Sequence, residues 1–321
     1  MSRPSLRVAR VAGSGADWVE QVWRAVVTVL ERAGGAQLRR GACALLVGLL
    51  AAHGAANAQP PHPSRAAVVG LAFDAGTRTI FKATAENLYR SGDEGRTWTA
   101  VTLPPAAARG RIAAVAVSAG NKPALYVAGP GMGVLRSDDD GRAWTSRSKG
   151  LPSDNNIVAL AAHAAQPGTV YVDVAGHGIF RSMDGGARWK LMDRGPRERI
   201  VRFIHTNMPG SMQTGWLFAA TAKGVSRAMD CFCGWHSAGA LGHAARAVAY
   251  DPSRPQDIYA ATDDALFLST NGGERWARIN APAPAVSALV VTPSGELYAG
   301  TGDGVLFRSA DRGRTWKRTG A

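Results

Sequence analysis

The chain is poor in cysteine and in aromatic residues. It has three cysteines in 321 residues, and Phe, Trp and Tyr together make up 7% of it. So few cysteines exclude a disulfide-rich scaffold. The low aromatic content, beside 38 glycines and 17 prolines, favours a fold with many turns over a helical bundle. With 46% hydrophobic and 19% charged residues, the composition is globular and sufficient for one large or two ordinary domains.

The N-terminal region lacks an apolar run long enough to cross a bilayer. Its apolar stretch, residues 42–52, has 11 residues, whereas a spanning helix needs roughly 20. Arg39 and Arg40 precede this stretch, and the small residues Ala56 and Ala58 follow it. This order predicts a secretory signal over residues 38–58, cleaved after Ala58. We therefore expect a periplasmic or secreted protein with no stable membrane anchor after cleavage.

Residues 1–37 form an abnormally long leader to this signal. A helical stripe that includes Trp18, Val22 and Trp23 runs through them. Two interpretations stay open: an amphipathic helix on a membrane surface, and a mis-assigned start with translation beginning near Leu38. The predicted organisation is a leader of doubtful status at 1–37, a signal peptide at 38–58 and one folded domain at 59–321.

A repeat of 40 to 46 residues runs through that domain. Its signature is Ser-x-Asp-x-Gly-x-x-Trp, which five of six copies keep with Asp or Asn at the third position. The acidic or amide residues of the six copies are Asp93, Asp139, Asp184, Asp230, Asn271 and Asp311. The tryptophans that end the copies are Trp98, Trp144, Trp189, Trp235, Trp276 and Trp316. Four short apolar β-runs accompany each copy, which is the content of one propeller blade. The sequence therefore predicts an all-β, six-bladed β-propeller with four-stranded blades.

The signature has a structural explanation that needs no ligand. Ser and Asp oxygens can accept backbone N–H groups inside a tight hairpin, Gly can adopt a positive φ, and Trp can clamp the hairpin onto its blade. The pattern resembles the Asp-box, or BNR, repeat, and the resemblance covers almost all of residues 65–321. It implies that these turns lie opposite the usual binding face, so we expect their carboxylates to hold neither ligand nor metal.

Propellers with this repeat include sialidases, other glycosidases, sortilin-like receptors and the photosystem II stability and assembly factor, so the resemblance does not select a function. A sialidase would carry Phe/Tyr-Arg-Ile-Pro before the first repeat, and residues 63–70 read PSRAAVVG instead. The tyrosines also argue against a catalytic tyrosine nucleophile. One repeat position is Tyr in four blades and Phe in the other two. Those six residues are Phe81, Tyr126, Tyr171, Phe218, Tyr259 and Tyr298. A position that accepts Phe serves packing.

A binding site is expected where the loops between second and third strands surround one mouth of the channel. Those loops carry residues that differ from blade to blade, namely Glu86, Met132, His177, Lys223, Asp263, Asp264 and Asp303. Asp173 replaces the small residue found at its position in the other blades, and we expect it to face the channel or a water there. A basic segment with Arg194, Arg197, Arg199 and Arg202, followed by His205, approaches the same mouth and could hold a phosphate or carboxylate.

Blade 4 departs from the repeat, since Ala228 replaces Ser and Phe232 replaces Gly. Its Cys231-x-Cys233 followed by His236 allows a disulfide, free thiols or a soft-metal site, of which the disulfide is favoured in an oxidising compartment. Nucleic acid is not an expected partner despite a net charge of +13, because no aromatic-interleaved basic groove is present. Many of the arginines instead recur before the turn, namely Arg90, Arg136, Arg181, Arg227 and Arg308.

These observations favour an exported, non-catalytic propeller that binds a protein partner or a glycan at the channel mouth. The expected binding residues are Asp173, His177, Arg194, Arg197, Arg199, Lys223, Asp263, Asp264 and Asp303. The alternative is a glycoside hydrolase, for which Asp173, Asp264 and Asp303 are the candidate carboxylates. No cofactor and no metal are expected in either case.

Overall fold

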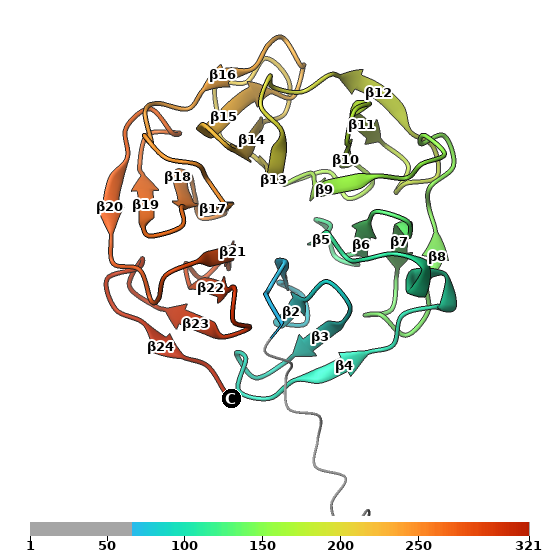
Figure 1. The fold of residues 1–321 in the computed structure, drawn as a ribbon, viewed down its shortest axis with the longest axis horizontal. Coiled ribbons are helices and arrows are strands. Elements are labelled where there is room, and N and C mark those ends of the chain that lie inside the picture. Colours follow the sequence, from blue (N-terminus) through green and yellow to red (C-terminus); the bar gives the residue numbers. More distant parts are fainter. Residues whose placement is uncertain (1–65, 321) are drawn as a thin grey trace, which may run out of the picture. The chain divides into compact units, whose positions relative to one another are not determined.

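The computed structural model describes residues 66–320, and the expected leader and signal segment lie outside them. Within this range, 24 strands form six antiparallel four-stranded sheets arranged in a ring (Figure 1). Each sheet uses four consecutive strands in chain order and is one propeller blade. The predicted six-bladed β-propeller is confirmed. Within the described range, the structure contains no helix of the length and hydropathy needed to cross a membrane.

The first three blades follow one another along the chain. Blade 1 consists of β1 (Gly70–Asp74), β2 (Thr79–Ala83), β3 (Leu88–Ser91) and β4 (Thr99–Val101). A short 3-10 helix, η1 (Pro105–Arg109), leads to the next blade. Blade 2 consists of β5 (Ala114–Val117), β6 (Leu125–Gly129), β7 (Gly133–Ser137) and β8 (Thr145–Ser146). Blade 3 consists of β9 (Ile157–Ala162), β10 (Val170–Val174), β11 (Gly178–Ser182) and β12 (Lys190–Asp193).

The remaining blades complete the ring. Blade 4 consists of β13 (Ile200–Thr206), β14 (Trp216–Thr221), β15 (Gly224–Met229) and β16 (His236–Ser237). Blade 5 consists of β17 (Ala247–Asp251), β18 (Arg254–Ala261), β19 (Leu266–Ser269) and β20 (Ala277–Ile279). Blade 6 consists of β21 (Val286–Val291), β22 (Leu297–Thr301), β23 (Leu306–Ser309) and β24 (Lys317–Arg318).

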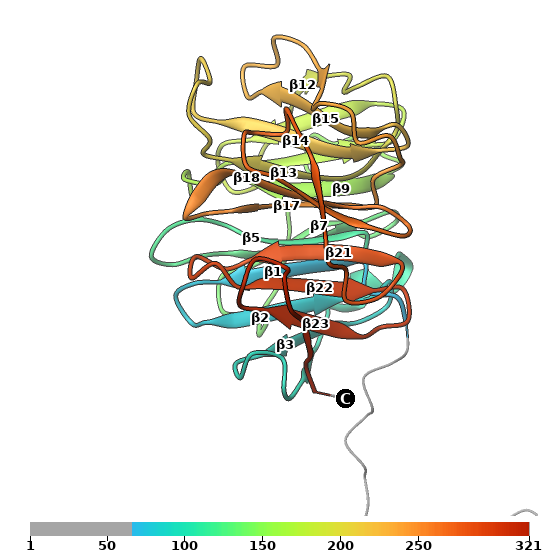
Figure 2. The same cartoon turned by 90° about the vertical axis from the view of Figure 1, so that its left-hand side faces the viewer.

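The strands run across the thickness of the ring (Figure 2). Because neighbouring strands of a blade are antiparallel, the loops between first and second strands share one face of the ring with the turns between third and fourth strands. We call this the turn face. The loops between second and third strands share the opposite face with the connections to the next blade, and we call this the loop face.

The hydrophobic core lies between neighbouring blades. Six clusters of buried side chains each combine residues from two adjacent blades, the sixth joining blade 6 to blade 1. The aromatic residues of the repeat position are at most 1% exposed, which confirms that they serve packing. They are Phe81, Tyr126, Tyr171, Phe218, Tyr259 and Tyr298. Small residues of the innermost strands, such as Ala249, let the blades converge on the channel.

The repeat turns have the hydrogen bonds that the sequence predicts. In blade 2, Ser137 Oγ donates to Asp139 Oδ1 at 2.7 Å and accepts the backbone N–H of Gly141 at 2.8 Å. Asp139 Oδ1 also accepts the N–H of Ala143 at 2.8 Å. Gly141 has a φ of 86°, a conformation in which a side chain is strained. The same network recurs in blades 1, 3, 5 and 6.

The tryptophans join neighbouring blades, whereas we expected each to clamp its turn onto its own blade. Trp144 Nε1 donates to the Thr102 carbonyl oxygen at 3.0 Å, and Thr102 directly follows the outer strand of blade 1. Trp189, Trp235, Trp276 and Trp316 likewise donate to a residue of the preceding blade. The indole reaches across because its ring packs into the core shared by the two blades, as Trp144 does.

The ring closes without exchanging a strand between its first and last blades. Each sheet of the described range holds only its own four strands. Closure comes from Val68, whose N–H donates to the Thr301 carbonyl at 3.1 Å and whose carbonyl accepts Ser287 Oγ at 2.7 Å. An ion pair between Arg308 and Glu94, at 3.6 Å, adds to the seam.

Candidate functional site

The loop face of blades 3, 4 and 5 carries three similar pairs of a basic and an acidic side chain. Each joins the loop between second and third strands to the connection that enters the same blade. His177 Nε2 lies 3.2 Å from Asp154 Oδ2 in blade 3, and Lys223 Nζ lies 2.9 Å from Glu198 Oε1 in blade 4. Arg246 binds Asp263 through two nitrogens in blade 5, at 2.6 and 3.0 Å. We call these six residues the rim pairs.

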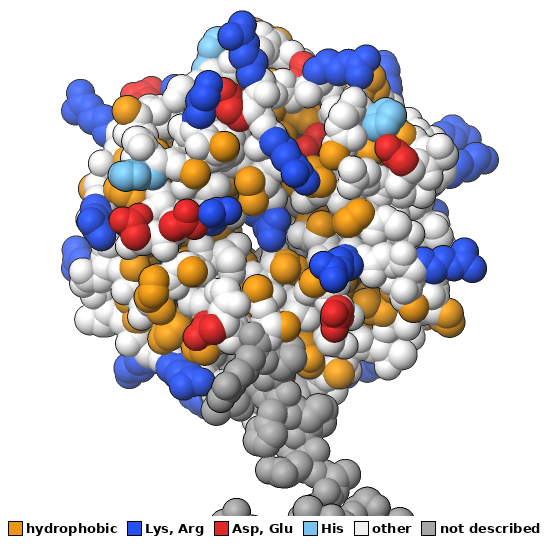
Figure 3. Space-filling model, in the orientation of Figure 1, with side chains coloured by type: hydrophobic (Ala, Val, Ile, Leu, Met, Phe, Trp, Pro, Cys, Tyr) orange, Lys and Arg blue, Asp and Glu red, His pale blue; other side chains and the backbone are white. Residues whose placement is uncertain are grey.

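The three predicted arginines of this face are exposed. Arg194 Nη1 donates to the His177 carbonyl at 3.2 Å, while Arg197 and Arg199 lie nearby in the same connection. Basic and acidic side chains alternate over the face drawn in Figure 3 and do not form a patch of one sign. Mixed charge of this kind gives specificity to a protein interface more than it gives affinity.

Two of the carboxylates proposed for hydrolysis are held within their own loops. Asp264 accepts a hydrogen bond from Thr262 at 3.0 Å, and Asp303 accepts one from Thr301. Both carboxylates are exposed. Met132 is not an exposed loop residue, contrary to the sequence interpretation. It is 6% exposed because it packs into the core between blades 1 and 2.

Asp173 is buried on β10 with an 8% exposed side chain. Burial raises the pKa of this carboxyl to about 6, although the positive charge of Arg199 opposes the shift. Asp173 does not line the channel, which corrects the sequence expectation. The reason is its place on the second strand, where it pairs with Ala159 of the innermost strand and stands one strand back from the channel.

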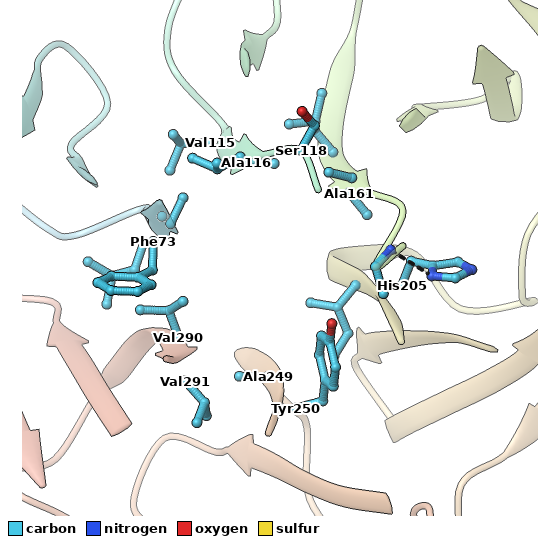
Figure 4. A pocket seen from close by; sticks show the side chains of 18 of the residues that line it. Phe73, Val115, Ala116, Ser118, Ala161, His205, Ala249, Tyr250, Val290 and Val291 are labelled. Carbon is cyan, nitrogen blue, oxygen red and sulfur yellow. Dashed lines mark hydrogen bonds between the residues drawn. The ribbon is translucent and has the colours of Figure 1, made fainter. Parts of the chain in front are cut away.

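A cavity of about 330 Å³ occupies the centre of the ring. All six innermost strands line it, mostly with small and apolar side chains (Figure 4). Its wall also includes the first loops of several blades, among them Gly76, Gly120 and Pro293, so the cavity reaches the turn face. Its polar wall residues include Arg202, Tyr250 and His205. The volume is at the lower end of the range for small-molecule sites.

His205 lies at the turn-face end of β13 and is 2% exposed, so the sequence interpretation of it as part of the loop-face approach is wrong. Strands advance about 3.3 Å per residue, and His205 is the sixth residue of β13 after the strand enters from the loop face. Together with His163 and Asp230 it forms a buried cluster whose possible metal-binding atoms lie within 4.8 Å of one another. Histidine and aspartate side chains grouped in this way are typical ligands of a metal ion.

Hydrogen bonds from the backbone fix the state of both imidazoles. Nδ1 of His205 accepts the N–H of Ala164 at 3.1 Å. Nδ1 of His163 accepts the N–H groups of Ala165 and Gln166, both at 3.0 Å. In a neutral imidazole whose Nδ1 is an acceptor, Nε2 carries the proton. Burial lowers the pKa of His205 to about 4, which keeps this ring neutral at pH 7.

The cluster therefore disfavours a metal ion. A histidine that binds metal through Nε2 normally donates its Nδ1 proton to an acceptor, and here both Nδ1 atoms face N–H donors. The Nε2–H groups already have partners, because His205 faces Asp230 Oδ2 at 3.5 Å and His163 faces Thr214 Oγ1 at 2.7 Å. Burial opposes ionisation of Asp230, but hydrogen bonds from Thr214, Ser211 and His205 lower its pKa. This arrangement is a satisfied structural network.

The network explains the irregular turn of blade 4. Asp230 holds the loop between β13 and β14, through Ser211 and Thr214, and does not hold its own hairpin. Phe232 takes a positive φ of 58° where other blades have Gly, and it packs against the core between blades 3 and 4. Of the alternatives left open for the cysteines, the structure contains the Cys231–Cys233 disulfide.

The fold is shared with solved structures of different functions. A GH74 enzyme from Niastella koreensis matches with a TM-score of 0.54 and 19% identity, over 78% of this chain and 46% of that one. A GH74 xyloglucanase from Xanthomonas campestris matches with a TM-score of 0.52 and 20% identity, over 79% and 47%. YCF48 bound to a D1 peptide matches with a TM-score of 0.53 and 18% identity, over 80% and 82%.

The chain thus spans slightly less than half the length of the two GH74 proteins. Neither a protein-family model nor a curated protein sequence matches it. At these identities the likeness shows a propeller fold of the kind found in GH74 and YCF48 proteins, and it transfers no activity.

Proposed function

We propose that this chain is an exported, non-catalytic binding protein that holds a protein partner, or a glycan, at the loop-face mouth of the channel. The rim pairs are the observation that carries this proposal. They place acidic and basic groups, most of them exposed, on three consecutive blades in the same structural position. Exposed ion pairs contribute little to stability, so their charges remain available for a partner at small cost to the fold.

A protein partner fits the surface formed by the rim pairs better than a glycan does. Alternating charges match a protein surface of complementary charge and reject a mismatched one. Arg197 and Arg199 flank Glu198, a member of the blade 4 rim pair, in sequence. Export is the part of the proposal that rests on the sequence, through the predicted signal at residues 38–58.

Charge reversal on the two faces of one blade tests the proposal. Arg194→Glu changes the loop face of blade 3, and Arg188→Glu changes the exposed turn face of the same blade as a matched control. Co-purification from periplasmic extract should recover a partner with wild type and Arg188→Glu, and lose it with Arg194→Glu. Equal recovery with all three proteins would contradict the proposed face. Specific signals on a glycan array, lost in Arg194→Glu alone, would assign the face to a glycan.

A glycoside hydrolase remains the second candidate because of Asp173. A buried carboxyl with a pKa of about 6 has the property of a general acid. Two observations argue against hydrolysis. The charge that shifts the pKa of Asp173 is that of Arg199, which is a cation, and the candidate carboxylate Asp303 belongs to the opposite blade of the ring. Hydrolysis of a glycoside requires two carboxylates on either side of one bond. Turnover of chromogenic glycosides by wild type that vanishes in Asp173→Asn would establish the enzyme and overturn the binding proposal.

A further inference from the structure

One position of the innermost strands differs in size and charge from blade to blade. In five blades the residue at this position is Gly or Ala. It pairs with a small residue of the second strand in four of these blades, and with Asp173 in blade 3. These residues are Gly70, Ala114, Ala159, Ala247 and Ala288. Blade 4 has Arg202, which pairs with Ala220. A long cationic side chain therefore stands in the cavity wall at a position where the other blades carry at most a methyl group.

Arg202 has few partners for its charge. Its Nη1 donates to the Val201 carbonyl at 2.7 Å, and its buried Nε has no hydrogen-bond partner within residues 66–320. Burial alone lowers the pKa of Arg202, with no nearby carboxylate to oppose it. Arg202 is half-buried, with a fully buried Nε. Arginine stays charged in proteins, and partial burial of a cation without a counter-charge is unfavourable. The arrangement is therefore short of one anion.

The other ionisable groups of the cavity wall are already satisfied. The Asp74 carboxylate accepts Gly76 N–H at 2.7 Å and Thr77 Oγ1 at 2.9 Å. His163 and His205 belong to the network around Asp230. Tyr250 lies on the wall beside His205 (Figure 4) and, with its pKa raised to about 12 by burial, is a neutral hydroxyl at pH 7.

Apart from Ser118, whose Oγ accepts the N–H of Ala124 at 2.9 Å, the remaining side chains of the wall are apolar. Phe73, Val115, Ala161, Val290 and Val291 surround the space with carbon (Figure 4). A planar guanidinium matches a carboxylate through two parallel hydrogen bonds, and an apolar wall favours an apolar body. We infer that the central cavity is a binding site for a small monocarboxylate with an apolar body, entered from the turn face and anchored by Arg202. This site is separate from the rim pairs, and its existence does not depend on the proposed function.

The blades themselves supply the test variant. Arg202→Ala gives blade 4 the residue that four other blades carry, so the fold should survive, which circular dichroism and thermal melting will check. Arg188→Ala, which removes an exposed arginine of blade 3 outside the cavity wall, is the matched control. Calorimetric titration with octanoate, octanol and inorganic phosphate separates the roles of the charge and the apolar chain.

We expect one octanoate per chain for wild type and Arg188→Ala, with similar affinities. Arg202→Ala should bind octanoate at least about tenfold more weakly, because the charge-assisted pair is lost, and wild type should bind octanol more weakly by a similar factor. The inference is overturned if folded wild type binds no octanoate, if Arg202→Ala binds it as well as wild type, or if octanol or phosphate binds as tightly as octanoate.

Discussion

Trp189 donates its indole N–H to the carbonyl oxygen of Arg147 at 2.7 Å, and so joins the repeat turn of blade 3 to the outer edge of blade 2. Trp189 is 9% exposed, and Trp144, in the same position of blade 2, is only partly buried. The repeat tryptophan thus stabilises the contact between blades as well as its own hairpin.

Replacing Trp189 by Ala should lower the free energy of unfolding by roughly 3 to 5 kcal/mol, through loss of buried aromatic surface and of the bond to blade 2. Trp144→Ala should cost less, since this ring is more exposed. Denaturant unfolding of both variants measures the difference. Equal losses, or a larger loss for Trp144→Ala, would contradict the burial argument.

Asp173 should make stability depend on pH in a defined window. Its folded-state pKa of about 6 lies above the usual 3.8, so the native state holds a proton that the unfolded state releases. Its contribution is fully present below about pH 4 and is lost as the pH rises through 6. Asp173→Asn should therefore be more stable than wild type by about 3 kcal/mol at pH 7, with the difference disappearing near pH 4. A difference that stays constant from pH 4 to pH 7 would exclude this role.

Lys82 is a buried basic residue that should also make stability depend on pH. It is 3% exposed, its Nζ lies 4.3 Å from the centre of the Trp98 ring, and burial lowers its pKa from 10.5 to about 8. The unfolded state then binds more protons between these values, so stability rises with pH from about 8 to 10.5. Lys82→Met should be more stable than wild type by about 3 kcal/mol at pH 7. Melting curves should show this gap narrowing above pH 8, and a gap that widens there would be the opposite of the expected sign.

Asp230 and Asp139 occupy the same repeat position, but replacing them by Ala should lower the free energy of unfolding by different amounts. Asp230→Ala leaves His205, Ser211 and Thr214 without their acceptor at a buried site, and should cost about 2 to 4 kcal/mol. Asp139→Ala exposes its turn donors to water and should cost less. Urea unfolding of the two variants compares them directly. If both losses are alike, the buried network contributes no more than an ordinary turn.

Export makes a separate prediction about the N-terminus. Cleavage after Ala58 should leave Gln59 as the first residue of protein recovered from the periplasm, because Ala56 and Ala58 flank the site. Intact-mass measurement decides this. A recovered chain that still contains Cys43 rules out the predicted cleavage.

The fold was predictable because its information is local and repeated six times. One turn signature and one aromatic position, such as Tyr126, suffice to count the blades and to assign the buried residues. The candidate site was less predictable. Aligning the second strands by sequence singles out Asp173. The first strands can be aligned only when their pairing with the second strands is known, and that pairing, seen in the structure, singles out Arg202.

The buried cluster was beyond the sequence for a different reason. His163, His205 and Asp230 come from two blades and three separate strand ends, and only the packing of blade 3 against blade 4 brings them together. Asp230 also has the position of an ordinary turn residue, so the signature itself concealed its role. The substitutions Ala228 and Phe232 were the available signal that this turn differs.

The seam closed by Val68 has a consequence for how the molecule assembles. Since every blade is one uninterrupted stretch of chain, each can complete its backbone pairing during synthesis as soon as its outer strand has been made. Contacts between neighbouring blades also form in order, and only the meeting of blade 6 with blade 1 joins distant parts of the chain. This meeting turns an open arc into a circle and encloses the channel around Arg202. We expect amide exchange to be fastest along this junction, since it is the one boundary between blades of the described ring that no chain connection crosses, so the circle can open there most easily.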